Sequence, residues 1–577
     1  MKIIRVSLDN CKIRHDSNSD SYAGLGGRGL TSLLIHQETP HTCDPLGKDN
    51  KLVFAPGILT GTNLVNSGRL SVGSKSPLTG GIKESNVGGT ASLALKRAGI
   101  DALVIDGAYT DGKWSGLFIS KTGQVRLQNV DRYSKLRTYE LIDRILSDYG
   151  DKHSVLCIGP AGELQVRSAS IQCSDMSNRP SRAAGRGGLG AVMGSKGLKC
   201  IVIERGGDSI VPIADAKTFN LAAKEFSKVI REYPLTSSAM AQLGTAMMVE
   251  PINKAGAFPC YNATKGYFER WNDISAEALV HLIDERGGKK EHAACSKCII
   301  RCSNVILDKK GRFLTAGLEY ETIWSTGAMC GISDLDTIAN LDFLCDDIGL
   351  DSMNTGVAVG VAMDSGYRTF GDSQAAMELV EEVAKGSKMG RIIGDGPASV
   401  GEFFRRHRAP VCKKQSIAAY DPRALLGMAV SYATSPMGAD HTAGWVVGSN
   451  LAEFGGHLDR FSSEGQIEAS RVAQVESAAY DSTGLCLFSG SPREDHPEFQ
   501  HLILAMLGAK AGKTFSNEQY LQLGRRILRA EKTFNINAGF TSSDDRLPGF
   551  FYDEPLPPHN RTVTIRDEEL DMTLDHI

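Results

Sequence analysis

Residues 52–59, Leu-Val-Phe-Ala-Pro-Gly-Ile-Leu, decide the class of the N-terminal fold. Three similar stretches follow, at 101–109 (DALVIDGAY), 154–162 (SVLCIGPAG) and 198–206 (LKCIVIERG). In each, valine, isoleucine and turn residues alternate over a short distance, which is typical of strands in sheets. We expect few helices here, with one at residues 90–99. Residues 1–212 are therefore predicted to form a β-rich domain.

The pattern becomes helical near residue 211. In 211–233 (VPIADAKTFNLAAKEFSKVIREY), Asp215 is placed to cap a helix whose apolar residues recur at helical spacing, namely Phe219, Ala222, Ala223 and Phe226. A helical domain at 213–417 and a second at 418–577 complete the prediction. The charged tail after Pro557 is expected to be loosely held. The predicted fold class is α+β.

The composition is that of an ordinary globular protein. The chain has 577 residues, 41% hydrophobic and 23% charged, with a net charge of −3. This balance argues against nucleic-acid partners and a basic membrane face. No apolar run is long enough to span a membrane, and the N-terminal apolar stretch is too short for a secretory signal. Thirteen cysteines, mostly scattered singly, favour a reducing, cytoplasmic location.

Three cysteines form the sharpest local motif, Cys295-x2-Cys298-x3-Cys302. Three thiols at this spacing can hold one face of a [4Fe–4S] cluster, which needs a fourth ligand, and Cys486 is our candidate. A structural zinc site remains an alternative, because thiolates also suit zinc and His292 lies just upstream. Other cysteines, such as Cys345 and Cys412, are expected to be buried small hydrophobes.

Three regions are dense in glycine, at 55–62, 67–90 and 182–190, and the second and third also carry arginine or lysine. Glycine lets backbone amides approach an anion closely, so these loops predict a large phosphorylated cofactor. Gly185, Gly187 and Gly190 formally match a dinucleotide-binding fingerprint. A polar segment precedes them and a strand follows within ten residues, whereas the fingerprint needs a strand before it and a full helix after it. We therefore reject that interpretation.

Together these motifs resemble the aldehyde:ferredoxin oxidoreductase family. The resemblance rests on motifs in the family's order, namely GRLSVGSKSPLTG (68–80), NVGG (86–89), RAAGRGGLGAVMGSKGLK (182–199), the cysteine motif, CDDIGLDSMNTG (345–356), AAYDPR (418–423), DSTGLCLF (481–488) and a similar C-terminal ending. It covers nearly the whole chain. It implies a saddle-like sheet domain with two helical domains, and a tungsten ion chelated by two molybdopterins whose phosphates share Mg²⁺. Molybdenum would bind the same dithiolenes.

The resemblance also implies which residues hold the pterins. One D-x-x-G-L motif for each pterin is found in the family, and here they contain Asp346, Gly349, Leu350 and Asp351, and Asp481, Gly484, Leu485 and Cys486. Cys486 would then serve both cluster and pterin. Further matching positions are Arg69, Asn86, Gly88, Arg182 and Ala183. Read from the residues alone, Gly349 and Gly484 are also good helix C-caps, and both readings can hold together.

The family's reacting pair is a glutamate and a histidine, which the resemblance carries to Glu319 in 317–321 (GLEYE) and His441. His441 would donate a hydrogen bond to an aldehyde oxygen and Glu319 would act as base. The implied reaction is aldehyde oxidation to a carboxylic acid, with ferredoxin or an iron–sulfur subunit as electron acceptor. Reduction of a carboxylic acid or an aromatic thioester on the same scaffold, and a zinc-stabilised protein without catalysis, are the alternatives.

Two departures from the family pattern stand out. Ala443 occupies the position where many members carry a lysine two residues after the histidine. Residues 339–342 (Ala-Asn-Leu-Asp) replace the E-x-x-H that bridges some homodimers through iron. A homodimer or a hetero-oligomer stays open, but not through that metal. The sequence does not specify the aldehyde, the choice between tungsten and molybdenum, or the partner subunits.

Overall fold

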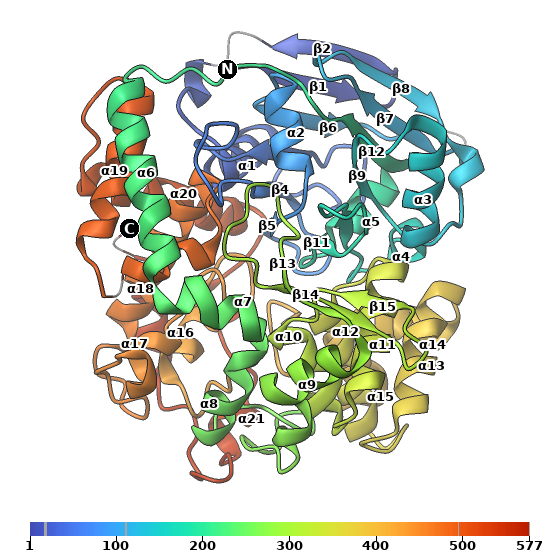
Figure 1. Ribbon diagram of the computed structural model, residues 1–577. Helices are drawn as coiled ribbons and strands as arrows, with labels where there is room; N and C mark the ends of the chain where they lie inside the picture. The colour runs from blue at the N-terminus through green and yellow to red at the C-terminus, as the bar shows by residue number, and fades with distance from the viewer. Residues whose placement is uncertain (17–19, 110–111, 494, 576) are drawn as a thin grey trace.

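The computed structural model describes residues 1–16, 20–109, 112–493, 495–575 and 577, and its N-terminal strands form two six-stranded sheets (Figure 1). The first sheet has the order β2-β1-β6-β3-β4-β5. Its strands are β1 (Ile3–Ser7), β2 (Lys12–Asp16), β3 (Leu52–Pro56), β4 (Leu70–Lys75), β5 (Ile82–Val87) and β6 (Ala102–Asp106). Only β1 and β6 pair in parallel in this sheet; its other pairs are antiparallel.

The second sheet has the order β11-β10-β9-β12-β7-β8, and only β7 and β12 pair in parallel. Its strands are β7 (Ser115–Ile119), β8 (Val125–Asn129), β9 (His153–Cys157), β10 (Ile171–Cys173), β11 (Arg182–Ala184) and β12 (Leu198–Glu204). Strand residues alternate between two faces. Leu103 and Ile105 of β6 therefore share one core with Leu117 and Ile201 of the second sheet, while Val104 faces a different core.

Helices are more prominent in this region than the sequence predicted. The expected helix is present as α2 (Ala91–Arg97), but α1 (Gly27–Glu38) and α3 (Thr138–Tyr149) were missed, as were the short α4 (Pro160–Glu163) and α5 (Leu189–Ser195). The expectation of few helices was therefore wrong. In α1 every residue from Gly27 to Ile35 is buried, so the polar face that reveals an amphipathic helix is absent.

The middle of the chain is mainly helical and carries one small sheet. Asp215 caps α6 (Ala216–Glu232) as predicted, since its carboxylate accepts from the Thr218 amide at 3.0 Å. The sheet consists of β13 (Lys289–His292), β14 (Ser303–Leu307) and β15 (Phe313–Ala316) in that order, and the cysteine motif is the loop between its first two strands. The main helices that follow are α11 (Leu335–Ile348), α12 (Ser352–Asp364), α13 (Ser373–Lys385), α14 (Lys388–Gly394) and α15 (Pro397–Phe404).

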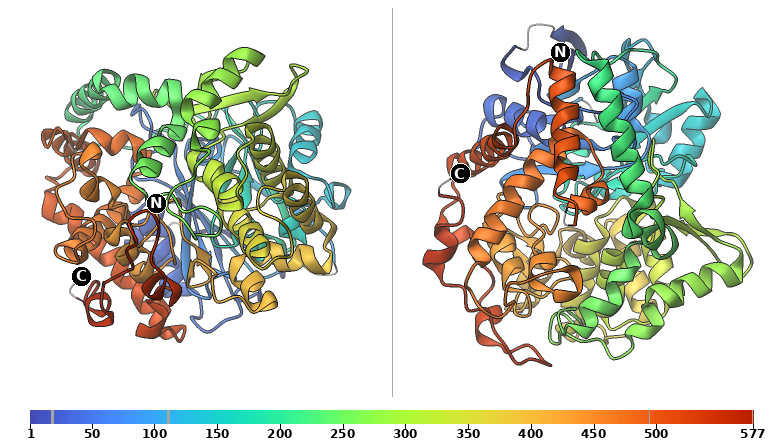
Figure 2. Two further views of the ribbon diagram at one scale, coloured as in Figure 1. Left: turned by 90° about the horizontal axis from the view of Figure 1, so that it is seen from below. Right: turned by 60° about the vertical axis from the view of Figure 1, so that its left-hand side comes forward.

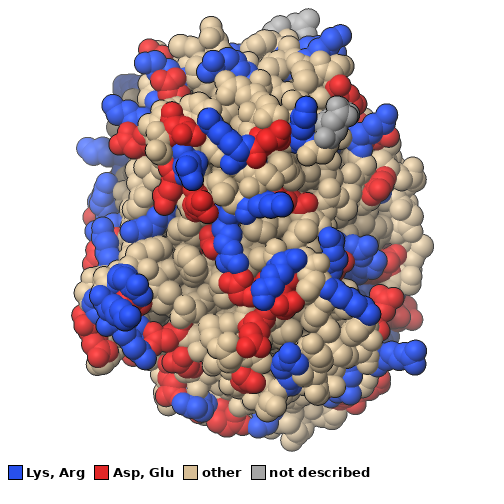
Figure 3. Space-filling model, turned by 90° about the vertical axis from the view of Figure 1, so that its right-hand side faces the viewer, with Lys and Arg blue, Asp and Glu red and all other residues tan. Residues whose placement is uncertain are grey.

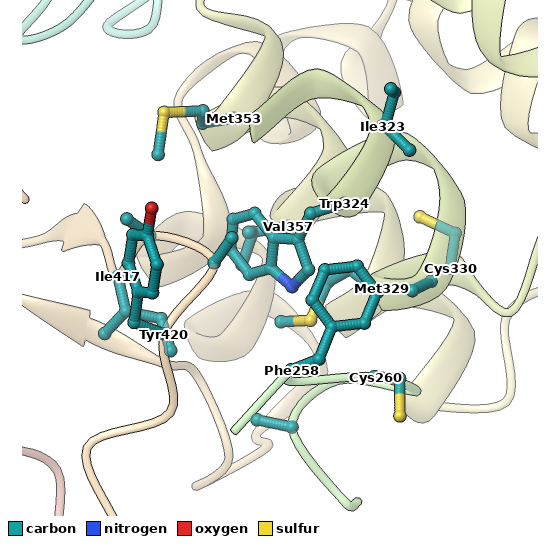
Figure 4. Packing of buried hydrophobic residues seen from close by; sticks show 14 of the residues in the cluster. Phe258, Cys260, Ile323, Trp324, Met329, Cys330, Met353, Val357, Ile417 and Tyr420 are labelled. Carbon is teal, nitrogen blue, oxygen red and sulfur yellow. The ribbon is translucent and has the colours of Figure 1, made fainter. Parts of the chain in front are cut away.

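Aromatic side chains tie the middle of the chain to its last third. Trp324 is fully buried and donates its indole N–H to the Pro259 carbonyl at 2.6 Å, so its polar atom is satisfied. Figure 4 shows Trp324 packed with Phe258 and Met329, with Tyr420 of the last third nearby.

Cys345 and Cys412 are 1% exposed, as predicted for small hydrophobes.

The last third contains the helices α16 (Leu426–Thr434), α18 (Gln466–Thr483), α19 (Glu498–Ala511) and α20 (Asn517–Asn537). In Figures 1 and 2, α20 lies beside α1 of the N-terminal domain, although the two are far apart in sequence. The prediction of a loosely held tail was wrong, because apolar residues at intervals in the charged tail anchor it in the core. They are Val563, Ile565, Leu570 and Leu574.

The architecture is therefore α+β, with N-terminal sheets and helices after them, as predicted. The domain boundaries at 212 and 417 stay predictions. On the face in Figure 3, acidic and basic side chains are interspersed rather than separated. Among the described residues, no helix is long and apolar enough to cross a membrane.

Candidate functional site

Cys486 lies beside the three-cysteine loop, and Asn66 of the N-terminal domain joins the two segments. The Asn66 amide donates to the Lys297 carbonyl at 3.0 Å, and its own carbonyl accepts from the Cys486 amide at 2.8 Å. Asn66 Oδ1 also accepts from the Ile299 amide at 2.9 Å. The structure thus brings together the far downstream cysteine and the motif that we paired with it from the sequence.

The four thiols affect one another electrostatically. Burial raises the pKa of Cys298 to about 11, and the neighbouring Cys295 and Cys486 add to the shift. Burial, Glu319 and the other three thiols raise the pKa of Cys302 well above its ordinary value. Without a metal the thiols of Cys298 and Cys302 therefore hold their protons, and binding of a metal group would release them.

The histidine of the zinc alternative already has a partner. His292 Nε2 lies 3.2 Å from Asp175 Oδ2. In the described part of the chain, no three His, Cys, Asp or Glu side chains converge tightly enough to hold one metal ion.

Glycines of the N-terminal loops make close contact with this region. A Cβ on Gly88 would lie 2.4 Å from Cys295 Sγ, and one on Gly57 would lie 2.1 Å from Gly484 Cα. Only glycine allows backbones to approach this closely. Arg69 donates from Nε to Asn86 Oδ1 at 2.5 Å and from Nη2 to the Asn86 carbonyl at 3.1 Å. Burial raises the pKa of Cys486, and the nearby Arg69 charge opposes that shift.

The two D-x-x-G-L motifs end helices as the sequence suggested. Gly349 ends α11 and Gly484 ends α18, both in the left-handed region at φ 81° and 82°. Each helix end carries a partly buried aspartate of its motif. Burial, followed by the nearby Asp342, raises the pKa of Asp346 well above its usual value. Burial raises the pKa of Asp481 to about 6, although Arg28 and Arg69 oppose the shift.

Other predicted pterin positions make contacts within the protein. Asp351 Oδ1 accepts from the amides of Met353 and Asn354, so it caps α12, and its Oδ2 lies 3.4 Å from Arg186 Nε. Leu350 forms a β-bridge with Ala169, and Leu485 is a buried core residue. Ala183 pairs with Gln172 in the second sheet.

Glu319 is held by Arg182 rather than by His441. Arg182 Nη1 donates to Glu319 Oε1 at 3.1 Å, and Thr245 Oγ1 donates to Glu319 Oε2 at 2.6 Å. A Cβ on Gly317 would lie 1.4 Å from Arg182 Nη2, so this arginine passes directly over a glycine. Arg182 Nε is buried without a hydrogen-bond partner, which leaves a donor for an anionic group.

The carboxylate beside His441 is Glu321, two residues further along the same motif. His441 Nε2 lies 3.4 Å from Glu321 Oε1, and Glu321 Oε2 accepts from the Ala419 amide at 3.0 Å. Glu321 Oε1 and His441 Nδ1 are both buried without a hydrogen-bond partner. Burial raises the pKa of Glu321, while the nearby His441 opposes that shift.

The prediction that Glu319 and His441 flank a metal stays a prediction. The structure adds Glu321 as the carboxylate next to His441, whereas Glu319 contacts Arg182 and Thr245. Residues 320–322 begin a helical turn, which directs Glu319 and Glu321 to different neighbours.

The residues present fit a bis-pterin group and a cluster. Two partly buried aspartates with raised pKa lie at the ends of α11 and α18, Arg182 has an unpartnered buried nitrogen, and Gly88 lies directly against Cys295. Carboxyl groups can pair with the N–H groups of a pterin, and arginine with its phosphate.

Comparison with known proteins agrees with this arrangement. Residues 3–205 match the model of the aldehyde ferredoxin oxidoreductase N-terminal domain, and residues 221–576 match that of its domains 2 and 3. The tungsten-containing aldehyde ferredoxin oxidoreductase of Pyrococcus furiosus is 33% identical over 99% of this chain and 94% of its own length. The enzyme of the same name from Thermococcus kodakarensis is 34% identical over the same shares.

Two more distant relatives have other substrates in their names. The WOR-like subunit of an aliphatic sulfonate oxidoreductase from Pyrococcus furiosus is 26% identical over 96% of this chain and 90% of its own length. The active-site complex BamBC of benzoyl coenzyme A reductase, solved with 1,5-dienoyl-CoA, covers 100% of this chain and 93% of its own. It superposes with a TM-score of 0.81 at 19% identity, which shows the shared fold.

Fold and site together define an oxidoreductase in which β-sheets and helices enclose a deeply placed polar site. With both family models matched across nearly its whole length, the chain belongs to the aldehyde ferredoxin oxidoreductase family.

Proposed function

We propose that this protein is a cytoplasmic tungsten–bis(molybdopterin) enzyme that oxidises aldehydes to carboxylic acids. One observation carries the proposal. Glu321 and His441 face each other with unpartnered buried polar atoms, and they lie among the loops that match the family's pterin-binding motifs. The names of the curated relatives at 33–34% identity support the same reaction.

In this proposal Asp346 and Asp481 accept hydrogen bonds from the two pterins, and Arg182 binds phosphate with its free Nε. Arg69, Asn86, Gly88 and Ala183 complete the pterin and Mg²⁺ surroundings. The bound metal–pterin group would supply the two-electron oxidising power. Glu319 keeps Arg182 in place, because it occupies one edge of the guanidinium.

The side chains of the reacting centre have separate tasks. Conversion of an aldehyde and water to a carboxylic acid releases two electrons and two protons. His441 donates a hydrogen bond to the aldehyde oxygen, where negative charge develops during attack by water. Glu321, in its ionised form, accepts a proton from that water through Oε1, while the Ala419 amide holds Oε2.

Cys295, Cys298, Cys302 and Cys486 would hold a [4Fe–4S] cluster, which suits transfer of electrons to a one-electron carrier such as ferredoxin or an iron–sulfur subunit. Elemental analysis of anaerobically purified protein, combined with a benzyl viologen assay, tests the proposal. We expect one tungsten (or molybdenum) and about four irons per chain, with dye reduction by aldehydes. The absence of both metals, dye reduction only by sulfonates, or oxidation of reduced dye only by aromatic thioesters would overturn it.

Replacing Cys302 with serine should remove most of the iron and the broad visible absorbance, because a thiolate ligand of the cluster is lost. The matched control is Cys11→Ser, since Cys11 is exposed and far from the motif. Iron content and the ultraviolet–visible spectrum are measured on both variants. Equal iron in Cys302→Ser and the control would show that Cys302 is not a ligand.

A further inference from the structure

We propose that Lys83 is a positioning residue for His441, acting through an ion pair with Asp440. Lys83 Nζ lies 2.6 Å from Asp440 Oδ2, and this contact joins residues 357 positions apart. The inference rests on the proposed function, in which His441 acts on the aldehyde. It goes further by identifying what holds the histidine in place.

The lysine is built into the interior of the N-terminal domain. Its side chain, from β5, is 0% exposed. It runs across Gly187, where an added Cβ would lie 2.5 Å from Lys83 Cγ and 2.9 Å from Cδ. Gly187 also has φ +86°, a conformation that favours glycine. The Lys83 side chain therefore packs directly against Gly187 of the 182–190 loop, and its ammonium group reaches Asp440.

Asp440 shapes the turn that carries the histidine. Its Oδ1 accepts from the Thr442 amide at 3.1 Å and from Thr442 Oγ1 at 2.8 Å. These bonds join the two residues on either side of His441. The other Asp440 oxygen receives Lys83. Both oxygens are therefore used, one for the local turn and one for the contact between domains.

A second cation holds the same loop from the other side. Arg186 Nη1 donates to the Ala439 carbonyl at 2.8 Å, and Nη2 donates to Ser416 O and Oγ at 2.7 Å each. Residues 436–456 contain no lysine or arginine, so both cations come from the N-terminal domain. Burial would raise the pKa of Asp440, but Lys83 and Arg186 together hold it well below its usual range.

His441 depends on this support because its own ring is weakly held. Nδ1 has no partner, and Nε2 has only the 3.4 Å contact with Glu321. The ring also lies against Tyr420, with 6.0 Å between the ring centroids. Its position otherwise depends on the backbone of residues 439–442, which Lys83 and Arg186 hold. A displacement of about 1 Å in a reacting group can cost about 100-fold in rate.

The test compares Lys83→Met, which keeps the length of the side chain but removes its charge, with Lys196→Met. Lys196 is also a buried lysine, but it donates to the Asn50 and Gly107 carbonyls away from the site. With tungsten and iron contents confirmed, Lys83→Met should lower kcat about 100-fold with little change in KM. Lys83→Arg, which keeps the charge, should recover much of the loss, and Lys196→Met should keep the wild-type kcat.

Hydrogen–deuterium exchange gives a readout that does not need turnover. The Thr442 amide and its neighbours should exchange faster in Lys83→Met, while the same segment is unchanged in Lys196→Met. If the wild-type protein oxidises no aldehyde, the proposed function fails, but the exchange experiment still tests the contact between Lys83 and the loop.

A double-variant comparison separates positioning from direct catalysis. Because Lys83 acts through Asp440, Lys83→Met/Asp440→Asn should be no slower than the single variants. Should Lys83→Met not fold, this double variant, which leaves no buried unpaired charge, replaces it. Three results would each overturn the proposal. The first is a metal-replete variant without Lys83 that keeps the wild-type kcat and exchange rates. The others are a double variant in which the kcat losses of the single variants multiply, and a folded Lys83→Met protein that loses its tungsten.

Discussion

Glu321→Gln is expected to lower kcat for aldehyde oxidation about 1,000-fold, within the range that a positioned general base contributes. Glutamine has nearly the same shape and can still accept from the Ala419 amide, so the loop should be preserved. It cannot take a proton from water. Steady-state kinetics at confirmed tungsten content measure the effect.

The matched control is Glu319→Gln, two residues earlier. Glu319 contacts Arg182 and Thr245, so its loss should affect cofactor retention more than the rate per loaded site. A larger loss of kcat per tungsten in Glu319→Gln than in Glu321→Gln would return the role of base to Glu319.

The pH dependence follows from the same carboxylate. Burial raises the pKa of Glu321, and only the ionised form can accept a proton. Activity should therefore fall as pH drops through a midpoint above the ordinary carboxyl range, rather than within it. This acid limb should be absent from the residual activity of Glu321→Gln.

Glu531→Gln should cost about 3–5 kcal/mol in the free energy of unfolding, the usual effect of removing one partner from a buried pair. Arg28 of α1 donates from Nε and Nη2 to the two Glu531 oxygens at 3.0 and 2.9 Å, and both side chains are almost fully buried. With the carboxylate neutralised, Arg28 keeps only Asp481, at 3.5 Å. Urea denaturation monitored in the region of α1 and α20 measures the loss.

An exposed ion pair provides the comparison for that experiment. Glu250 and Lys254 are paired on the surface of a helix, and Glu250→Gln should leave the denaturation midpoint unchanged. Equal midpoints for Glu531→Gln and Glu250→Gln would show that the pair between α1 and α20 adds no stability.

Local patterns predicted a large part of the fold. The β-branched runs correctly located strands β3, β6, β9 and β12, because a short apolar run bounded by turn residues is visible within a few residues. Helix α1 was hidden, because residues 27–35 are all buried, the charged Arg28 included, so the sequence shows no periodic polar face. The tail was misjudged because its buried apolar residues are sparse among charged ones.

The candidate site was predicted in part. The spacing of the cysteine motif and the family resemblance located the thiols and the glycine loops, and the fold brings Cys486 to them through Asn66. Residue spacing could not choose between Glu319 and Glu321, because both lie in one short motif. Lys83 and Asp440 had no signal of their own, since each is an ordinary charged residue in a single sequence.

The sequence by itself determined the features that depend on neighbours along the chain, which include the thiol spacing, the helix ends at Gly349 and Gly484, and the family. The tertiary structure decided which carboxylate faces His441 and which cation holds its loop. Those choices depend on contacts between side chains far apart in sequence, such as Lys83 with Asp440, and the energy of such contacts exists only after the chain has folded.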